Sequence, residues 1–310
     1  MLTNLTQYLF YAVVAYTLLI LFAPWSWIAD VFITYVPQFV IAASMITVAL
    51  LLQKKFLRAL VLVAAILYFG FPLFFLWLPT PAKSNANGAQ EIITIMNANV
   101  NKDNREYQKL IDLIKSNNPT VITLNEVTAE WLATIKQAVG ERYPFTIEMT
   151  YEGYQGMAVL SQLPVSAQES LSFSERTPLL LHVSFADRQV TLFTLHALPP
   201  VSKSLMRERD AFLDFLADEV QSTFGSVIVA GDFNATIHGV SFRSFLEKTK
   251  LRDSRQGHGW QPSWFRGTIL AAAIDHILYR GENIRHTNFK VLTDIGSDHR
   301  PIMSTFSIAQ

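Results

Sequence analysis

Apolar residues dominate the first eighty positions and fall into three uncharged stretches, at about 5–23, 31–52 and 59–78. Each is close to the ~20 residues that a helix needs to cross a hydrocarbon core of ~30 Å. Tryptophans lie near the ends of these stretches, as they often do at membrane boundaries. We therefore expect three transmembrane helices in a membrane anchor over residues 1–82. The alternative is a buried helical hairpin of a soluble protein, but three such runs rarely fit one small core.

The few charges in this region predict its orientation. Asp30 is its only acidic residue, and its basic residues Lys54, Lys55 and Arg58 lie between the second and third stretches. Positively charged loops stay in the cytoplasm, so we expect everything after the third stretch to lie outside the inner membrane. Residues 1–10 carry no basic residue, which argues against a cleaved signal peptide. The expected product is a multi-pass membrane protein with an extracytoplasmic, periplasmic second part.

The pattern changes after residue 78. The stretch P-T-P-A-K-S-N-A-N-G-A-Q has no apolar period and predicts a tether, with the linker at 83–90. From 91 to 310, short β-rich segments and amphipathic segments predict one domain with a mixed order of strands and helices. Strands are expected at 92–100, 121–124, 145–150, 157–161, 179–185, 190–195, 227–230, 274–279 and 301–308, and helices at 104–115, after Thr128, and at 202–222 and 240–248. With a turn at 186–188, this order favours α+β layers over strict βαβ winding.

Charge and cysteine content narrow the possible partners. The chain has 25 basic and 25 acidic residues, of which the anchor holds three and one. A nearly neutral domain lacks the electrostatic footprint of a nonspecific nucleic-acid binder. The absence of cysteine fits an extracytoplasmic domain that avoids stray disulfides, although it decides nothing alone.

Polar side chains gather at the downstream ends of the predicted strands. They are Asn99, Glu126, His196, Asp232 with Asn234, and Asp298 with His299. Taken singly, several would be ordinary turn or helix-cap residues. Together, carboxylates and amides without cysteine suit Mg²⁺ or Mn²⁺ rather than zinc. Imidazoles beside such an ion can hold a phosphoryl group while the ion polarises an oxygen, which predicts metal-assisted hydrolysis of a phosphate ester.

Two motifs carry a family resemblance. The runs G-D-F-N at 231–234 and S-D-H-R-P at 297–301, with the upstream Asn, Glu and His in order, resemble the endonuclease/exonuclease/phosphatase superfamily. That superfamily includes pancreatic-type deoxyribonucleases, apurinic endonucleases, sphingomyelinases and inositol-polyphosphate 5-phosphatases. The resemblance spans about 91–308 and implies an α/β (α+β) fold, the DNase I-like four-layer sandwich of two mixed β-sheets flanked by helices. The anchor and the run H-A-L-P-P at 196–200 look like a bacterial membrane-anchored subgroup.

The resemblance also implies a site for Mg²⁺ or Mn²⁺. It makes Glu126 the principal ligand, with Asn99 beside it and Asp298 near the ion. Asn125 stands where the family often has glutamine, and Thr120 where an aspartate often follows the proline. Neither departure replaces a catalytic group.

Five residues carry the catalytic roles that the resemblance implies. Asp232 orients or deprotonates the attacking water, and Asn234 positions the water or the phosphate. His196 contacts a non-bridging phosphate oxygen, while His299 stabilises the transition state or transfers a proton. Asp275 holds the His299 ring, a pairing that also makes sense unaided because a carboxylate fixes the tautomer of an imidazole and raises its basicity.

Substrate contacts are expected from loops. Trp264 and Arg266 lie in the aromatic loop at 258–267, whose composition suits stacking on a base, a sugar or a lipid head group. The alternative is a loop that tucks its tryptophans over the core. We expect Tyr154 to line the rim and His238 to touch substrate, with an ordinary loop histidine as the alternative for the latter. Arg209, on the long helix at 202–222, is expected on a solvated face.

The sequence thus predicts a membrane-anchored, Mg²⁺- or Mn²⁺-dependent phosphoesterase. Its expected reaction is in-line attack of water on a phosphodiester of a lipid head group or a nucleic acid. Two alternatives stay open: an extracytoplasmic DNA or RNA endonuclease, and a catalytically silent binding or sensory domain of the same fold. Nothing in the sequence indicates a protein partner.

Overall fold

The structure is a computed structural model of the whole chain and describes residues 2–79, 90–149, 153–165, 167–173, 179–185 and 190–309. The predicted linker and the predicted turn at 186–188 lie outside these residues, apart from Gln90, which opens the first strand. The domain boundaries therefore stay predictions.

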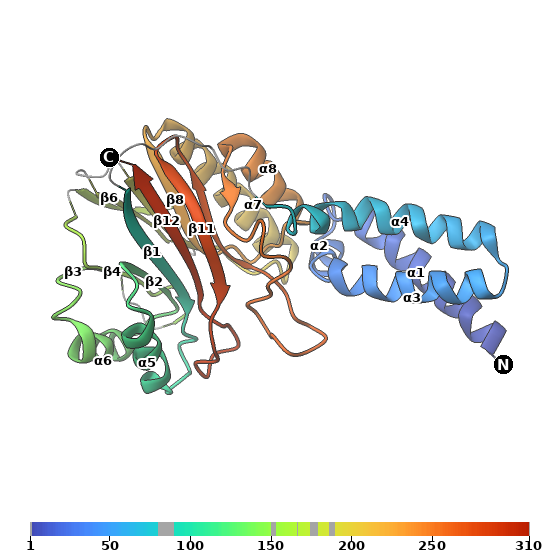
Figure 1. Cartoon of the computed structure of the whole chain (residues 1–310), viewed down its shortest axis with the longest axis horizontal. Helices are drawn as coiled ribbons and strands as arrows, with labels where there is room; N and C mark the ends of the chain where they lie inside the picture. The colour runs from blue at the N-terminus through green and yellow to red at the C-terminus, as the bar shows by residue number, and fades with distance from the viewer. Residues whose placement is uncertain are drawn as a thin grey trace.

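Four helices form the N-terminal part, which extends from the rest of the molecule as a bundle (Figure 1). They are α1 (Leu2–Leu21), α2 (Trp27–Ile33), α3 (Val36–Leu52) and α4 (Phe56–Phe75). Two of them, α1 and α4, are long and apolar enough to cross a membrane, and α2 with α3 makes a third span only if this pair, bent by 68°, counts as one. The predicted second segment is thus broken, because Pro37 favours a new helix start: in a first turn its missing N–H group is no loss.

Two six-stranded sheets form the second part. Their strand orders are β11-β12-β1-β2-β4-β3 and β5-β6-β7-β8-β10-β9. The strands are β1 (Gln90–Asn99), β2 (Val121–Asn125), β3 (Phe145–Met149), β4 (Met157–Ser161), β5 (Ala167–Ser172), β6 (Leu179–Phe185), β7 (Val190–His196), β8 (Ser226–Asp232), β9 (Arg252–Asp253), β10 (Asp275–Arg280), β11 (Ile284–Val291) and β12 (Ile302–Ala309). Each sheet has one parallel pair, β1 with β2 and β7 with β8, among antiparallel ones. The prediction of two mixed sheets is confirmed.

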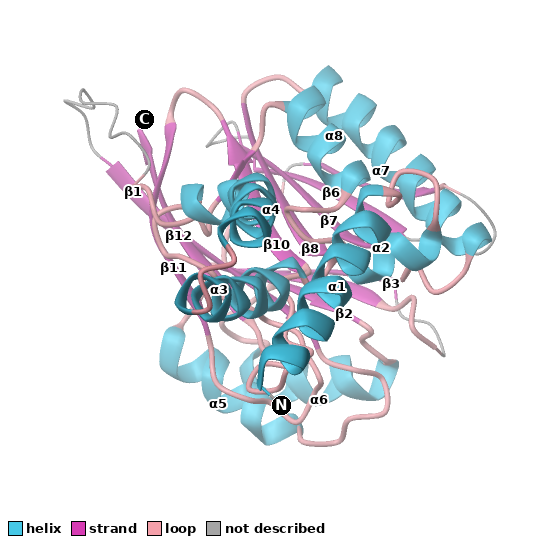
Figure 2. Ribbon diagram, turned by 90° about the vertical axis from the view of Figure 1, so that its right-hand side faces the viewer, coloured by secondary structure: helices cyan, strands magenta, loops and turns pink. Residues whose placement is uncertain are grey.

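Helices cover the outer face of each sheet. Figure 2 shows α5 (Tyr107–Asn117) and α6 (Ala129–Val139) on one side and α7 (Lys203–Ser222) and α8 (Val240–Thr249) on the other. Apolar side chains of both sheets, such as Ile95 and Ile228, fill the layer between them. Helix α6 begins where the sequence predicts, because the Thr128 hydroxyl accepts a hydrogen bond from the Trp131 N–H. The four-layer sandwich is confirmed.

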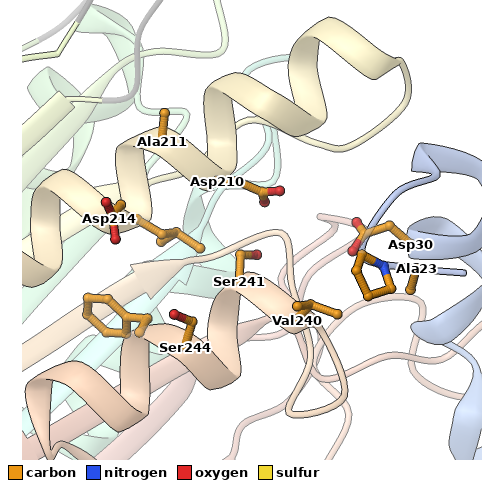
Figure 3. A pocket seen from close by; sticks show the side chains of 11 residues that line it. Ala23, Asp30, Asp210, Ala211, Asp214, Val240, Ser241 and Ser244 are labelled. Atoms are coloured by element: carbon orange, nitrogen blue, oxygen red, sulfur yellow. The ribbon is translucent and has the colours of Figure 1, made fainter. Parts of the chain in front are cut away.

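The helical bundle docks on the α7–α8 side of the sandwich. A carboxylate oxygen of Asp30, in α2, lies 2.8 Å from a guanidinium nitrogen of Arg209, in α7, and both side chains are buried. The expectation that Arg209 lies on a solvated face is therefore wrong: its side chain is buried and pairs with Asp30 of the helical bundle and with Asp210 of α7. A cavity of about 350 Å³ opens beside this pair, lined also by Asp210, Asp214 and Ser241 (Figure 3).

Candidate active site

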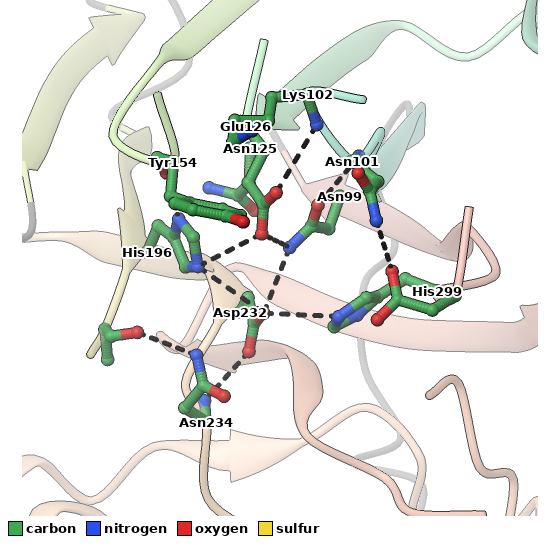
Figure 4. Close-up of polar contacts among 12 residues, drawn as sticks. Asn99, Asn101, Lys102, Asn125, Glu126, Tyr154, His196, Asp232, Asn234 and His299 are labelled. Atoms are coloured by element: carbon green, nitrogen blue, oxygen red, sulfur yellow. Dashed lines mark hydrogen bonds and ion pairs between the residues drawn. The ribbon is translucent and has the colours of Figure 1, made fainter. Parts of the chain in front are cut away.

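Strand register brings the predicted polar residues to one edge of the sandwich. In one parallel pair, Asn99 ends β1 opposite Asn125, which directly precedes Glu126. In the other, His196 ends β7 opposite Asp232 at the end of β8. Because parallel strands end at the same edge, both sheets deliver their polar ends there, as Figure 4 shows.

The Asn99 amide joins the two acids of this cluster. Its Nδ2 donates to Glu126 Oε1 at 3.0 Å and to Asp232 Oδ2 at 3.2 Å. Glu126 has a φ of 55°, a left-handed backbone that costs a residue of this kind on the order of 1 kcal/mol or more. This strain turns the glutamate toward Asn99 and Asp232. Its other oxygen, Oε2, accepts only a long 3.4 Å hydrogen bond from the Lys102 N–H among the described residues.

His196 faces both acids. Its Nε2 lies 3.8 Å from Glu126 Oε1 and 3.7 Å from Asp232 Oδ2. Its Nδ1 lies 2.9 Å from the Tyr154 carbonyl oxygen, so Nδ1 carries a proton and the ring is fixed with Nε2 toward the cluster. The backbone N–H of Asn234 donates to Asp232 Oδ1 at 2.9 Å, which fixes that carboxylate from the other side.

A second imidazole is held from behind by a buried acid. His299 Nδ1 lies 2.9 Å from Asp275 Oδ2, and its Nε2 lies 3.7 Å from Asp232 Oδ2. Burial alone would lower the pKa of His299, but the charges of Asp275 and Asp232 raise that pKa to about 10, so the ring is an imidazolium at neutral pH. Ser263 donates to the same Asp275 oxygen at 2.5 Å.

The pKa values of the two buried acids, Asp232 and Asp275, are shifted in opposite directions. Burial and the charge of Asp275 raise the pKa of Asp232 to about 6, so this carboxyl ionises close to neutral pH. Burial opposes ionisation of Asp275 as well, but the adjacent His299 keeps the pKa of Asp275 below its usual value. A carboxyl poised near neutrality beside a fixed cation is the pairing expected of an acid–base site.

Asp298 is directed toward the rim of the cluster. Its two oxygens accept hydrogen bonds from Asn101 Nδ2 and Trp264 Nε1, each at 3.0 Å. These contacts position the Trp264 loop, and they do not bring Asp298 to Glu126. The role of Asp298 near a metal ion stays a prediction.

The predicted substrate residues fall in different places. Tyr154 is exposed at the rim, with the Lys102 ammonium 4.6 Å from its ring centre. Trp264 pairs with the His299 backbone, and Arg266 follows it. His238 is not at the site, which corrects the sequence prediction: it is 3% exposed and its Nε2 lies 2.9 Å from the Phe69 carbonyl oxygen of α4.

Sequence reasoning missed several supporting residues. Asn101 binds Asp298, Ser263 binds Asp275, and Lys102 covers Tyr154 and reaches Glu126 through its N–H group. The run N-A-N-V-N-K offered a signal for the first and third, since it continues directly from Asn99. Nothing marked Ser263, which reaches Asp275 only through tertiary folding.

A divalent cation fits the donors of this cluster. Glu126 and Asp232 supply carboxylate oxygens that share the Asn99 amide, and Glu126 Oε2 is engaged only weakly. Hard oxygen donors of this kind suit Mg²⁺ or Mn²⁺. The ligand atoms of Asp232, Asp275 and His299 also lie within 4.8 Å of one another, but the imidazolium makes that trio a poorer cation site than the Glu126 side.

Comparison with known proteins identifies the family of the chain. Residues 85–299 match the profile of the Endonuclease/Exonuclease/phosphatase family. No curated protein matches the chain.

Solved structures share the fold. TDP2 of D. rerio, complexed with a single-strand DNA product, is 18% identical with a TM-score of 0.57 and covers 70% of this chain and 99% of its own. The 3′ phosphatase NExo from Neisseria, bound to a product DNA hairpin, is 19% identical with a TM-score of 0.57, covering 68% and 98%. A family protein from Bacteroides thetaiotaomicron is 16% identical with a TM-score of 0.58, covering 72% and 100%. At these identities the likeness shows the fold, and with the matched profile it follows that the chain belongs to the endonuclease/exonuclease/phosphatase family.

Proposed function

We propose that this protein is a membrane-anchored phosphoesterase that uses Mg²⁺ or Mn²⁺ to hydrolyse phosphodiesters. Membership of the family supports phosphoester hydrolysis in general. The observation that carries the proposal is the convergence of Glu126, Asn99, His196, Asp232 and His299, drawn from both sheets, at one edge.

The side chains divide the reaction between them. The His299 imidazolium, fixed by Asp275, donates to a phosphoryl oxygen and stabilises the charge that grows there. Asp232, ionised above about pH 6, orients the attacking water and accepts its proton. His196 donates to a second phosphoryl oxygen in the form that carries a proton on Nε2 as well as on Nδ1.

The reaction exchanges one P–O bond for another. The water oxygen forms the new P–O bond and gives one proton to Asp232, the ester P–O bond breaks, and the leaving alkoxide takes a proton from solvent. A cation held by Glu126 would neutralise phosphoryl charge and polarise the bond under attack. In-line geometry follows if water sits on the Asp232 side, opposite the leaving oxygen.

Anchoring and location belong to the same proposal. We place the anchor at 1–82, the linker at 83–90 and the catalytic domain at 91–310, with a bacterial inner-membrane location and the domain in the periplasm. Two to three helices apolar enough to span a membrane support anchoring, and Lys54, Lys55 and Arg58 support the orientation. A phosphatase reporter fused after Ala82 should be active only outside the cytoplasm, whereas an active cytoplasmic β-galactosidase fusion there would reverse the orientation.

Hydrolysis of bis-p-nitrophenyl phosphate by the purified full chain tests the reaction. We expect turnover with Mg²⁺, loss of turnover with EDTA, and a drop of at least about 10²-fold in Glu126→Gln and in His299→Gln, the usual cost of removing one charge-stabilising group. The matched control is Glu141→Gln, an exposed glutamate after α6. No metal-dependent turnover of any phosphoester would favour a silent binding or sensory domain.

Nucleic acid is the second candidate substrate. The rim pair of Lys102 over Tyr154 offers a cation and an aromatic face, the groups on which single-stranded bases stack. Plasmid DNA and RNA therefore belong beside phospholipid vesicles in the substrate comparison, and cleavage of nucleic acid alone would make the protein an extracytoplasmic endonuclease.

A further inference from the structure

The loop at 265–270 exposes apolar side chains close to the active site. Ile269 is 85% exposed, Leu270 47% and Phe265 37%. Neighbouring exposed apolar side chains of this size on one loop mark an interaction surface. The neighbouring helix α3 and two arginines near the loop indicate what contacts these apolar side chains.

Helix α3 holds this loop directly. Gln38 Nε2 donates to the Ile269 carbonyl at 3.1 Å and to the Ala271 carbonyl at 2.7 Å. Gln38 lies in the first turn of α3, so the loop meets the bundle where α3 begins. Figure 1 shows the corresponding orange segment projecting beside that end of the bundle.

An exposed apolar stripe runs from Gln38 along α3. Its members Ile41, Met45, Val48 and Leu52 are spaced by three or four residues and are 56%, 69%, 57% and 81% exposed. Residues at this spacing share one helix face. A face so apolar, on a helix of the proposed anchor, suits lipid rather than water. The apolar tip of the loop therefore continues a lipid-facing surface.

Two arginines stand at the base of the loop. The side chains of Arg266 and Arg300 are both partly exposed, and no described acid pairs with either. The two guanidiniums are close enough for the charge of Arg300 to add to burial in lowering the pKa of Arg266. Unpaired guanidiniums beside an apolar tip suit the phosphate layer of a bilayer.

The same loop leads into the active site. Trp264 and Ala272, at its two ends, exchange backbone hydrogen bonds of 2.9 and 3.0 Å. Trp264 also pairs with His299, and its indole donates to Asp298. A chain of direct contacts therefore runs from Gln38 of α3 through the loop and Trp264 to His299.

We propose that residues 265–270 insert into the bilayer surface beside α3, with Arg266 and Arg300 at the lipid phosphates, so that the site takes phosphodiesters of membrane phospholipids. The insertion of this loop does not depend on the protein being a phosphoesterase. The substrate class rests on the proposed phosphoesterase function.

Insertion can be measured without any activity. The chain has no cysteine, so Ile269→Cys carries a single polarity-sensitive fluorophore in the full chain, reconstituted into nanodiscs of phosphatidylethanolamine and phosphatidylglycerol. We expect blue-shifted emission that spin-labelled lipid quenches. The control is Phe224→Cys, a 94% exposed apolar position after the end of α7 that lies away from the anchor. Emission at residue 269 as water-like and unquenched as at residue 224 would overturn insertion.

The substrate class needs a second comparison. Ile269→Asp combined with Leu270→Asp should leave bis-p-nitrophenyl phosphate turnover unchanged and lower hydrolysis of vesicle phosphatidylglycerol, followed by phosphorus NMR, by about tenfold or more, since burial of two apolar side chains is lost. Equal loss on both substrates would overturn it. If wild type turns over the soluble diester and nucleic acid but no phospholipid, the lipid assignment fails and the phosphoesterase proposal stands. If it turns over no phosphoester, the proposed function fails, and the fluorophore still decides insertion.

Discussion

The buried pair between Asp30 and Arg209 joins the N-terminal helical bundle to the sandwich, and removing Arg209 should weaken that junction strongly. The two charges lie 2.8 Å apart, with side chains 4% and 2% exposed. Removing Arg209 leaves Asp30 buried without compensation, which typically costs about 3–5 kcal/mol, whereas removing the Asp30 charge leaves Arg209 paired with Asp210 at 2.7 Å and should cost less. Arg209 also donates to the Asn234 carbonyl at 3.3 Å, so the loss reaches the loop that holds Asp232.

A double-mutant cycle measures this energy. Asp30→Asn, Arg209→Met and the double variant would be compared with wild type by chemical unfolding of the full chain in detergent. We expect Arg209→Met to cost about 3–5 kcal/mol and Asp30→Asn to cost less, because Asp210 still pairs with Arg209. The double change should cost less than the sum of the two by about 2 kcal/mol or more. Arg207→Met, on the exposed face of the same helix, should cost under about 0.5 kcal/mol. Additive single effects, or single effects no larger than that of Arg207→Met, would refute the reasoning.

Three further predictions concern the site. Asn99→Leu removes the donor shared by two carboxylates and should lower kcat by about 10²-fold with little change in KM, as steady-state kinetics would show. The folded-state pKa of His299, about 10, lies above its ordinary value of 6.5. The stability that its charge confers is therefore present below about pH 6.5 and is lost as the pH rises through about 10. The Tm difference between wild type and His299→Gln, measured in EDTA, should shrink over that range. Gly156→Ala would press a methyl group against the Val127 carbonyl oxygen, and melting curves should show destabilisation; an unchanged Tm would contradict the packing described.

Much of the sandwich could be predicted, because hydrophobic periodicity and helix N-caps depend only on residues that are near each other in the sequence. The long helix at 202–222 is observed as Lys203–Ser222, with Ser202 as its N-cap. Strand β11 was not predicted, since Ile284–Val291 is an edge strand with a bulge between His286 and Asn288 and few buried positions. Its pairing with β12, not its own composition, makes it a strand.

The site was predictable for a different reason. Polar residues that directly follow an apolar strand are easy to recognise in a sequence. Asn99, Glu126, His196 and Asp232 could therefore be named in advance. Their supports could not, because contacts such as Ser263 with Asp275 join residues through folding alone. The roles assigned to all of them stay predictions.

The junction between the helical bundle and the sandwich was the least predictable part. Gln38 looked like one polar residue in an apolar run, yet it binds two carbonyls more than 200 positions away. His238 looked like a substrate contact because it follows Asn234 closely, but its ring turns to the Phe69 carbonyl oxygen instead. Such long-range pairings leave no periodic trace in a single sequence.

Manganese titration tests the central claim most directly, because it follows ion binding and hydrolysis in one sample. Free Mn²⁺ would be measured by electron paramagnetic resonance while bis-p-nitrophenyl phosphate turnover is recorded for wild type and Glu126→Gln. We predict that turnover rises in step with bound Mn²⁺ in wild type, and that Glu126→Gln loses both. Full turnover before any Mn²⁺ binds, or unchanged binding and turnover in Glu126→Gln, would contradict the account.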